Sequence, residues 1–320
     1  MVRRHFPTIS WLLVILMTST SAIDLVRNTV SGLQVYTVAG NLSKPVMLFL
    51  SAFPCSPAIA SVSKDMIGYF GETHTVVFYD TRGVGGSASS APNEKWDGHI
   101  TDAVSVAKWA AREHGNNKVT VWGYSFGTLL AIKVAARAAD VVDKVILTSL
   151  KVDQQKSSFI LNQAIEQVWG VPSFVSAQLP SEAVLGLAIS GPFRYACIRQ
   201  PRSLECFTGL LFPDARFLYD VYGLQDILRF PAQFAQCTSS IRTELEVARV
   251  ADKTGPLHAR VYVVHGKYDY IDAADYVLPA LANDIVAPSH TLVWMYKSGH
   301  APLIEEPEEY KRIMKQFLED

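Results

Sequence analysis

The sequence predicts an α/β fold with a doubly wound, mostly parallel sheet and a helical cap inserted into it. Short apolar runs alternate with helical stretches before residue 150 and again after residue 258. Parallel strands need long crossover connections, usually helices, so this rhythm favours a parallel sheet. Between residues 151 and 258 only helical patterns occur. Because both flanks share one rhythm, we expect one sheet domain, formed by residues 23–150 and 259–320, that carries a cap of residues 151–258.

The expected elements follow from local patterns. Strands are apolar runs that end at turns, and we expect them at residues 46–50, 75–79, 118–122, 144–147, 260–264 and 290–296. Helices in the sheet domain carry apolar residues near helical spacing, and we expect them at residues 99–114, 126–139, 273–281 and 307–318. In the cap we expect helices at residues 159–169 and 215–222, with Gly223 ending the second.

The composition is that of a globular protein. The 320 residues are 49% hydrophobic and 18% charged, which allows a sizeable core and argues against disorder. The formal net charge of −1 argues against nucleic acid as a partner, since phosphate-binding chains usually carry a basic excess. No C-x-x-C motif or histidine cluster indicates a metal site, and we expect no cofactor.

The N-terminal residues 1–22 indicate a signal peptide. A basic start at residues 3–5 precedes a short apolar run at residues 11–17 and small polar residues up to Ala22. The apolar run is shorter than the roughly 20 residues that span a bilayer, so we expect no stable membrane span after cleavage. We therefore expect a chain that is secreted or resides in the lumen of the secretory pathway. An uncleaved signal anchor is the alternative.

Two further features depend on that route. Four cysteines, Cys55, Cys197, Cys206 and Cys237, allow three disulfide pairings in an oxidising compartment. Cys197 with Cys206 is the most local pairing, and four reduced, buried thiols are the alternative. A sequon at Asn41 is a glycosylation site if the chain enters a eukaryotic secretory route.

Ser125 is the candidate nucleophile. It lies in the string Gly-Tyr-Ser-Phe-Gly at residues 123–127, between an expected strand and an expected helix. The string alone arises by chance in roughly one chain in ten of this length, and would then mark a structural turn. The strand–turn–helix context is what a nucleophile elbow requires, because the tight turn lifts the serine Oγ above the sheet. The two glycines let the backbone pass closely.

Asp269 and His300 are the expected partners of Ser125. A serine needs a base, and the base needs a carboxylate to orient it. Asp269 follows the strand at residues 260–264, and His300 follows the strand at residues 290–296. The carboxyl ends of strands are where open α/β sheets place their sites.

Two nearby residues are weaker candidates. Asp272 is the alternative acid, three residues past Asp269. His265 lies at the very end of its strand beside the proposed acid, so we expect it to pack or to support the site rather than to act as the base.

Further motifs carry a resemblance to a known family. Residues 80–87, Asp-Thr-Arg-Gly-Val-Gly-Gly-Ser, look like its D-x-R-G-x-G-x-S turn, and residues 299–307 look like its histidine loop and final helix. With the elbow and the order serine, acid, histidine, the chain resembles the α/β-hydrolase superfamily over nearly everything after residue 30. The resemblance implies an α/β-hydrolase fold and a serine hydrolase with Ser125, Asp269 and His300 as its triad.

Within the superfamily, the likeness points to prolyl aminopeptidase-like hydrolases. It rests on the arginine turn together with residues 266–270 (Gly-Lys-Tyr-Asp-Tyr), 287–288 (Ala-Pro) and 292–294 (Leu-Val-Trp). An aminopeptidase also needs carboxylates that bind the substrate ammonium. The cap offers Glu205, Asp214, Asp220 and Glu244, among which the sequence does not select.

The sequence departs from the family after the strand at residues 46–50. Relatives usually have His-Gly there, whereas this chain has Ser-Ala-Phe-Pro at residues 51–54. By position, the backbone N–H of Phe53 would be one oxyanion donor, and the N–H of Phe126, at a helix N-terminus, would be the other. Ala52 in place of glycine is compatible with this only if its φ is negative.

Asp80 and Arg82 in the arginine turn allow two interpretations. The first is that they fix the turn by an internal ion pair and hydrogen bonds to backbone, and the second is a substrate clamp. We favour the first.

The expected function is hydrolysis of an ester or amide bond of a small-molecule or short-peptide substrate through an acyl-enzyme. The same catalytic residues serve an aminopeptidase and a carboxylesterase or lipase-like enzyme, so they do not indicate which of these the protein is. A lyase or a carbon–carbon bond hydrolase with the same triad is an alternative, and so is a binding protein with a dead site. A nucleophilic aspartate would have indicated dehalogenase or epoxide chemistry, but Ser125 occupies that position.

Overall fold

The computed structural model of the chain describes residues 23–38, 44–52, 55–93, 95–114, 117–169, 215–246, 248–250 and 255–320. The expected signal peptide and residues 170–214, 247 and 251–254 of the expected cap lie outside the described residues. The structure therefore describes the sheet domain and the two ends of the cap segment.

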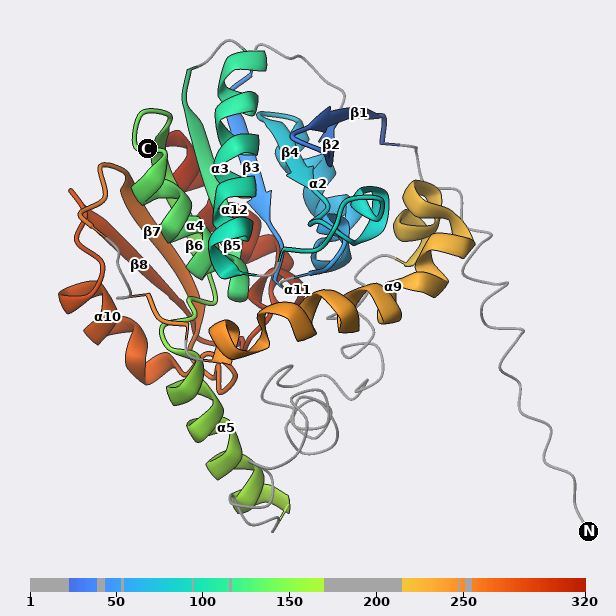
Figure 1. The fold of residues 1–320 in the computed structure, drawn as a ribbon. Helices are drawn as coiled ribbons and strands as arrows, with labels where there is room; N and C mark the ends of the chain where they lie inside the picture. Colours follow the sequence, from blue (N-terminus) through green and yellow to red (C-terminus); the bar gives the residue numbers. More distant parts are fainter. Residues whose placement is uncertain are drawn as a thin grey trace, which may run out of the picture.

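One eight-stranded sheet forms the centre of the molecule (Figure 1). Its strands are β1 Leu25–Val30, β2 Leu33–Val38, β3 Val46–Leu50, β4 Thr75–Tyr79, β5 Val119–Tyr124, β6 Val142–Thr148, β7 Arg260–Gly266 and β8 His290–Met295. They are arranged in the order β1-β2-β4-β3-β5-β6-β7-β8. All pairs from β4 to β8 are parallel, so the sheet is the mostly parallel one expected. β6 and β7 are neighbours although the whole cap separates them in sequence, which makes the cap an insertion into one sheet.

The antiparallel edge of the sheet was not predicted. β1 and β2 form a hairpin, and β2 pairs antiparallel with β4. The turn between them is Ser31-Gly32, where both residues have positive φ, 52° and 81°. Such two-residue turns match the right-handed twist of the flanking strands. A Ser-Gly pair between two runs of strand-forming residues was therefore a signal for this hairpin in the sequence.

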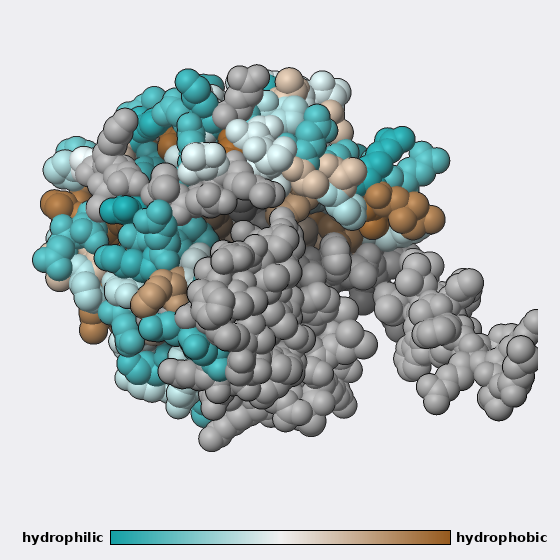
Figure 2. All heavy atoms as spheres, turned by 60° about the horizontal axis from the view of Figure 1, so that its bottom comes forward, coloured by the Kyte–Doolittle hydropathy of each residue, from teal (hydrophilic) through white to brown (hydrophobic). Residues whose placement is uncertain are grey.

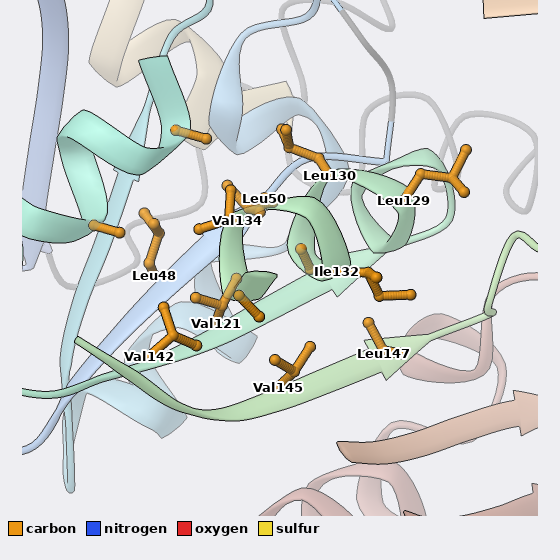
Figure 3. Packing of buried hydrophobic residues seen from close by; sticks show 14 of the residues in the cluster. Leu48, Leu50, Val121, Leu129, Leu130, Ile132, Val134, Val142, Val145 and Leu147 are labelled. Carbon is orange, nitrogen blue, oxygen red and sulfur yellow. The ribbon is translucent and has the colours of Figure 1, made fainter. Parts of the chain in front are cut away.

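Helices cover both faces of the sheet (Figure 1). Val46, Leu48 and Leu50 of β3 face α3 (Trp96–Glu113), α4 (Phe126–Arg137) and α10 (Val277–Asn283). Figure 3 shows part of this layer, with Leu48, Val121 and Leu147 from three strands packed under α4. Met47 and Phe49 face the opposite way, toward α2 (Lys64–Gly71) and α12 (Pro307–Glu319). Because strand side chains alternate between faces, a sheet covered on both sides needs the continuous apolar runs from which the strands were predicted.

The helices end close to the expected positions, with some shifts. α3 begins three residues earlier than expected, and the residues expected to form one helix at 273–281 form the short helix η3 (Ala274–Tyr276) followed by α10. α2, which was not predicted, begins after Ser63, whose side chain accepts a hydrogen bond from the N–H of Met66. The short helix α11 (Pro302–Glu305) follows the histidine loop and precedes α12.

The described part of the cap contains two helices. α5 (Gln154–Trp169) leaves the sheet after β6, and α9 (Ala215–Glu246) crosses below the sheet in the view of Figure 1. Gly223 was expected to end a helix, and it has φ 72° and ψ 168° within α9, where it breaks the helical geometry between two helical parts. Figure 2 shows this side of the molecule, where the described surface is largely hydrophilic with separate hydrophobic areas. Among the described residues, no helix is long and apolar enough to cross a membrane.

Candidate active site

Ser125 lies on a tight turn between β5 and α4. Its backbone has φ 50° and ψ −118°, a conformation that residues with a side chain rarely adopt. The turn is fixed by two backbone hydrogen bonds, from the N–H of Ser125 to the carbonyl of Thr148 (2.9 Å) and from the N–H of Thr128 to the carbonyl of Ser125 (2.9 Å). The string at residues 123–127 therefore has the strand–turn–helix geometry that the sequence predicted.

The two glycines of the elbow have no room for a side chain. A Cβ on Gly123 would lie 2.4 Å from the carbonyl oxygen of Gly127. A Cβ on Gly127 would lie 2.3 Å from the carbonyl oxygen of Leu50. Both contacts are to backbone that cannot move aside, so close approach of the elbow to itself and to β3 requires glycine at both positions.

His300 reaches Ser125 from the loop after β8. Its Nε2 is 2.9 Å from the Oγ of Ser125, and both side chains are almost fully buried. Glu305 holds the loop in place, because its carboxylate accepts hydrogen bonds from the N–H groups of Gly299 and Ala301. The base is thus aimed by the first turn of the helix that follows it.

Asp269 contacts the other nitrogen of His300. Its Oδ2 is 2.9 Å from Nδ1 of His300, and its Oδ1 accepts the N–H groups of Ile271 and Asp272. A neutral imidazole that donates from Nδ1 to a carboxylate has Nε2 free to accept a proton. The structure therefore brings together Ser125, His300 and Asp269 in the geometry of a serine–histidine–aspartate triad.

His265 supports the acid rather than the nucleophile. It is completely buried, and its Nδ1 accepts the N–H of Leu150 (2.9 Å) while its Nε2 lies 2.9 Å from the carbonyl of Asp272. That second contact makes Nε2 the protonated nitrogen, which also faces Oδ2 of Asp269 at 3.5 Å. The position agrees with the expectation of a packing and supporting residue.

The site shifts the pKa values of base and acid in opposite directions. Burial alone lowers the pKa of His300, but the charge and the hydrogen bond of Asp269 outweigh it, so the pKa of His300 is raised. Burial alone raises the pKa of Asp269, but the charge and the hydrogen bond of His300 outweigh it, so the pKa of Asp269 is lowered. Burial lowers the pKa of His265, which keeps this second histidine neutral.

Asp272, expected as an alternative acid, occupies a different place. Its Oδ2 is 3.8 Å from Nδ1 of His300, beyond hydrogen-bond distance, but lies 3.2 Å from Oγ of Ser125, where it competes with Nε2 of His300 for the single hydroxyl hydrogen. Its Oδ1 forms a buried ion pair with Lys151. Lys151, three residues past the end of β6, was not singled out from the sequence, because its residue type alone does not indicate burial.

Only one of the two expected oxyanion donors lies among the described residues. The N–H of Phe126 lies at the start of α4 and donates to the carbonyl of Ala52 at 3.3 Å. Ala52 is not among the described non-glycine residues with positive φ, so alanine fits where relatives usually have glycine. Phe53, the other expected donor, lies outside the described residues.

The arginine turn is fixed by hydrogen bonds to backbone, as we expected, but not by the expected internal ion pair. Arg82 forms a bidentate ion pair with Asp102 of α3, not with Asp80. Asp80 is completely buried and accepts four hydrogen bonds, from the hydroxyls of Tyr36 and Tyr222 and from the N–H groups of Ala58 and Gly86. The expected internal ion pair is therefore wrong, and with its acceptors filled Asp80 is not available as a substrate clamp.

Cys55 and Cys237 form a disulfide, so the alternative of four reduced thiols is wrong. The bond joins the loop after β3 to α9 across a sequence separation of 182 residues. The other pair that this leaves, Cys197 with Cys206, lies outside the described residues. His99 also approaches the two sulfurs, but sulfurs joined in a disulfide are not thiolate ligands for a metal.

The remaining candidate residues are the glycosylation site and the four cap carboxylates. Asn41, Glu205 and Asp214 lie outside the described residues. Of the other two cap carboxylates, Asp220 is exposed on α9, and Glu244 accepts a hydrogen bond from the N–H of Trp96.

The fold and the site define an α/β hydrolase. A family model described as the alpha/beta hydrolase fold matches residues 45–307, and the chain belongs to this family. A curated relative, "Probable aminopeptidase YbaC" from Bacillus subtilis (strain 168), is 23% identical over 287 residues, which covers 83% of this chain and 86% of that protein.

Solved structures show the same fold. A proline iminopeptidase-related protein from Thermus thermophilus is similar with a TM-score of 0.59 and 17% identity, covering 93% of this chain and 98% of that chain. A 2-hydroxy-6-oxo-6-phenylhexa-2,4-dienoate hydrolase from Rhodococcus sp. strain RHA1 is similar with a TM-score of 0.58 and 17% identity, covering 93% of this chain and 100% of that chain. The chain is therefore a hydrolase by family.

Proposed function

We propose that this protein is a secreted serine hydrolase that cleaves an ester or amide bond of a small substrate through an acyl-enzyme. The observation that carries the proposal is the chain of two hydrogen bonds from Ser125 through His300 to Asp269, each 2.9 Å long. A binding protein with a dead site would have no need to keep three buried polar side chains in this order.

The first half of the reaction forms the acyl-enzyme. Ser125 Oγ attacks the carbonyl carbon, and its proton moves to Nε2 of His300, while Asp269 stabilises the imidazolium that forms. The carbonyl π electrons move onto the oxygen, which the N–H of Phe126 stabilises once it releases the carbonyl of Ala52, together with the N–H of Phe53. The tetrahedral intermediate then expels the leaving amine or alcohol, which takes the proton from Nε2.

The second half of the reaction hydrolyses the acyl-enzyme and releases the carboxylic acid product. Water attacks the acyl carbon and gives its proton to Nε2 of His300, and the second tetrahedral intermediate collapses with return of that proton to Oγ of Ser125. His300 is thus neutral at the start of each half, which is the state in which its Nε2 can accept.

Among serine hydrolases, we propose that this protein is an aminopeptidase. This assignment is supported by the resemblance to prolyl aminopeptidase-like hydrolases, and by the similarity to a probable aminopeptidase from Bacillus subtilis and to a proline iminopeptidase-related protein from Thermus thermophilus. A panel of prolyl amides against short and long acyl esters decides between peptidase and esterase.

Secretion is part of the proposal because residues 1–22 have the pattern of a signal peptide and Cys55 and Cys237 are oxidised. We expect cleavage after Ala22 and a glycan on Asn41 when a eukaryotic host makes the chain. N-terminal sequencing of the chain recovered from the medium tests the cleavage, and an N-terminus at Met1 would contradict it.

Labelling with a fluorophosphonate probe tests the nucleophile. We expect the wild-type protein to be labelled and the Ser125→Ala variant to lose the label and at least about 1,000-fold in kcat/KM, since the remaining groups cannot form the acyl-enzyme. Ser239→Ala, which removes an exposed hydroxyl from α9, is the matched control and should behave as wild type. Labelling that survives Ser125→Ala would overturn the assignment.

A further inference from the structure

The triad has a second buried carboxylate that the acyl-enzyme chemistry does not use. Asp269 already occupies Nδ1 of His300, yet Oδ2 of Asp272 lies 3.2 Å from Oγ of Ser125. The side chain of Asp272 is 0% exposed, so its charge is held at the nucleophile without help from water. Burial of such a charge is costly unless it has a partner or a task.

Lys151 orients this carboxylate. Its ammonium forms the ion pair with Oδ1 of Asp272, and its backbone N–H donates to Oγ1 of Thr128 in α4, which ties it to the elbow. Besides that ammonium, no hydrogen-bond donor among the described residues contacts Oδ1. The arrangement turns Oδ2 toward Ser125, where it accepts one hydrogen bond and has a lone pair for another.

The charges at the nucleophile do not balance. Two buried carboxylates, Asp269 and Asp272, face one ammonium, that of Lys151. His265 is neutral because burial lowers its pKa, and His300 is neutral when it is ready to act as a base. One negative charge therefore remains, and a cationic group on the substrate would neutralise it.

The distance suits one particular cation. When a residue with a free amine is acylated through its carbonyl carbon, three bonds separate its α-nitrogen from the serine oxygen, which places the two atoms about 3–4 Å apart. A carboxylate oxygen 3.2 Å from Oγ of Ser125 is within hydrogen-bond reach of a nitrogen at that distance. Of the described cap carboxylates, Asp220 is exposed on α9, and Glu244 accepts a hydrogen bond from the backbone N–H of Trp96.

We infer that Asp272 binds the free α-ammonium of the substrate residue whose carbonyl Ser125 attacks, with Lys151 as the positioning residue for its carboxylate. The inference rests on the proposed hydrolase function and narrows it to amides and esters of amino acids with an unblocked amine. The ammonium donates to Oδ2 in place of the hydroxyl of Ser125, which leaves that hydroxyl directed at Nε2 of His300.

Matched pairs of substrates that differ only at the α-nitrogen test the inference. Prolyl-7-amido-4-methylcoumarin is compared with its cyclopentanecarbonyl analogue, and the alanyl amide with its isobutyryl analogue, because a carbon replaces the nitrogen without added bulk. The measured quantity is the ratio of kcat/KM for the amine substrate to that for its analogue. We expect Asp272→Asn to lower this ratio about 10- to 100-fold, the effect of losing one hydrogen bond to a charged group.

Asp275→Asn is the matched control. It makes the same charge change three residues away on an exposed side chain, and its ratio should equal that of wild type. Because Asp272→Asn leaves Lys151 unpaired, the double variant D272N/K151M removes both charges and should show the same lowered ratio. Thermal unfolding midpoints establish that the variants compared are folded.

The outcomes separate the inference from the proposed function. A ratio that Asp272→Asn leaves unchanged, or equal losses on both members of a pair, would overturn the role of Asp272 while the fluorophosphonate label on Ser125 still supported the hydrolase. The role of Asp272 would also be overturned if the wild-type protein had equal kcat/KM values for the amine substrates and for their analogues. Failure of the wild-type protein to take the label would instead remove the proposed function itself.

Discussion

Asp80 and Asp269 are both completely buried near the carboxyl ends of parallel strands, yet they do different things. Asp80 follows β4, and its donors are two tyrosine hydroxyls and two backbone N–H groups, from Tyr36, Tyr222, Ala58 and Gly86. Asp269 lies in the loop after β7, and besides backbone N–H groups its partners are two histidines, His300 and His265. The two regions differ in whether the partners can take up a proton.

The difference sets the direction of each pKa. Burial raises the pKa of Asp80, and its neutral donors lower it without offsetting the burial. For Asp269 the burial is outweighed by the charge interaction and the hydrogen bond with His300, which hold the pKa of Asp269 below its ordinary value. Fixed dipoles can therefore hold a buried carboxylate in place, but an ionisable partner keeps it charged and able to stabilise a cation during the reaction.

Asp80 has an architectural role that Asp269 lacks. Its four donors come from β2, the loop after β3, the arginine turn and α9, so one carboxylate ties four separate segments together. Tyr222 is the contribution of the cap, and it lies on the same helix as the disulfide partner Cys237. The arginine turn thus stabilises the packing of these segments, whereas the loop that carries Asp269 belongs to the proposed triad.

The largest expected effect belongs to Asp269. Asp269→Asn should lower kcat/KM about 10,000-fold, because the amide would fix His300 in the tautomer that cannot accept the proton of Ser125. Steady-state kinetics on the best substrate of the panel measure it. A loss smaller than about tenfold would mean that another group orients His300, and the contrast between the two carboxylates would fail.

Asp80→Asn should act on stability instead. The amide nitrogen would face donors where an acceptor is needed, so we expect the free energy of unfolding to fall by about 2–4 kcal/mol. Denaturant unfolding measures this, and kcat/KM of the folded fraction should stay within about threefold of wild type. Asp275→Asn provides the control for removing an exposed carboxylate. An activity loss as large as that of Asp269→Asn would place Asp80 in the chemistry.

The smallest expected effect, and the most specific test of the difference between Asp80 and Asp269, is a shift in the pH dependence of kcat/KM. His300 must be neutral to accept a proton, and the groups that face it, Asp269 and Asp272 against Lys151, leave its pKa raised. Activity should therefore fall as the pH drops through a value above about 6.5, the ordinary pKa of histidine. Removal of the negative charge in Asp269→Asn should move this acidic limb to lower pH. Asp80→Asn should not move it, and a limb that shifted equally in both variants would contradict the comparison.

The sequence predicted the parts of the site that depend on order and strand ends. Ser125, Asp269 and His300 each follow a strand whose apolar run is visible in the sequence, and parallel strands bring such ends to one edge. The pairing of Arg82 with Asp102 and the bond between Cys55 and Cys237 were not predictable in this way. They depend on how α3 and α9 pack, which local periodicity does not encode.

Asp272 and Lys151 illustrate the same limit within the site. Spacing alone suggested that Asp272 could replace Asp269, because both lie in one loop. The loop instead directs the backbone N–H of Asp272 to Asp269 and its carboxylate to Ser125 and Lys151. Which of two neighbouring acids reaches a histidine depends on backbone direction over three residues, and a pattern of residue types does not contain that direction.

The disulfide between Cys55 and Cys237 closes a covalent ring in the chain. Ser125 lies inside the ring, whereas Asp269 and His300 lie on the tail that leaves it. A protease that cuts the backbone once between residues 55 and 237, which includes all of residues 170–214, opens the ring but separates nothing. Nucleophile, base and acid then remain parts of one covalent molecule, and only the combination of a cut with a thiol reductant divides it into two chains.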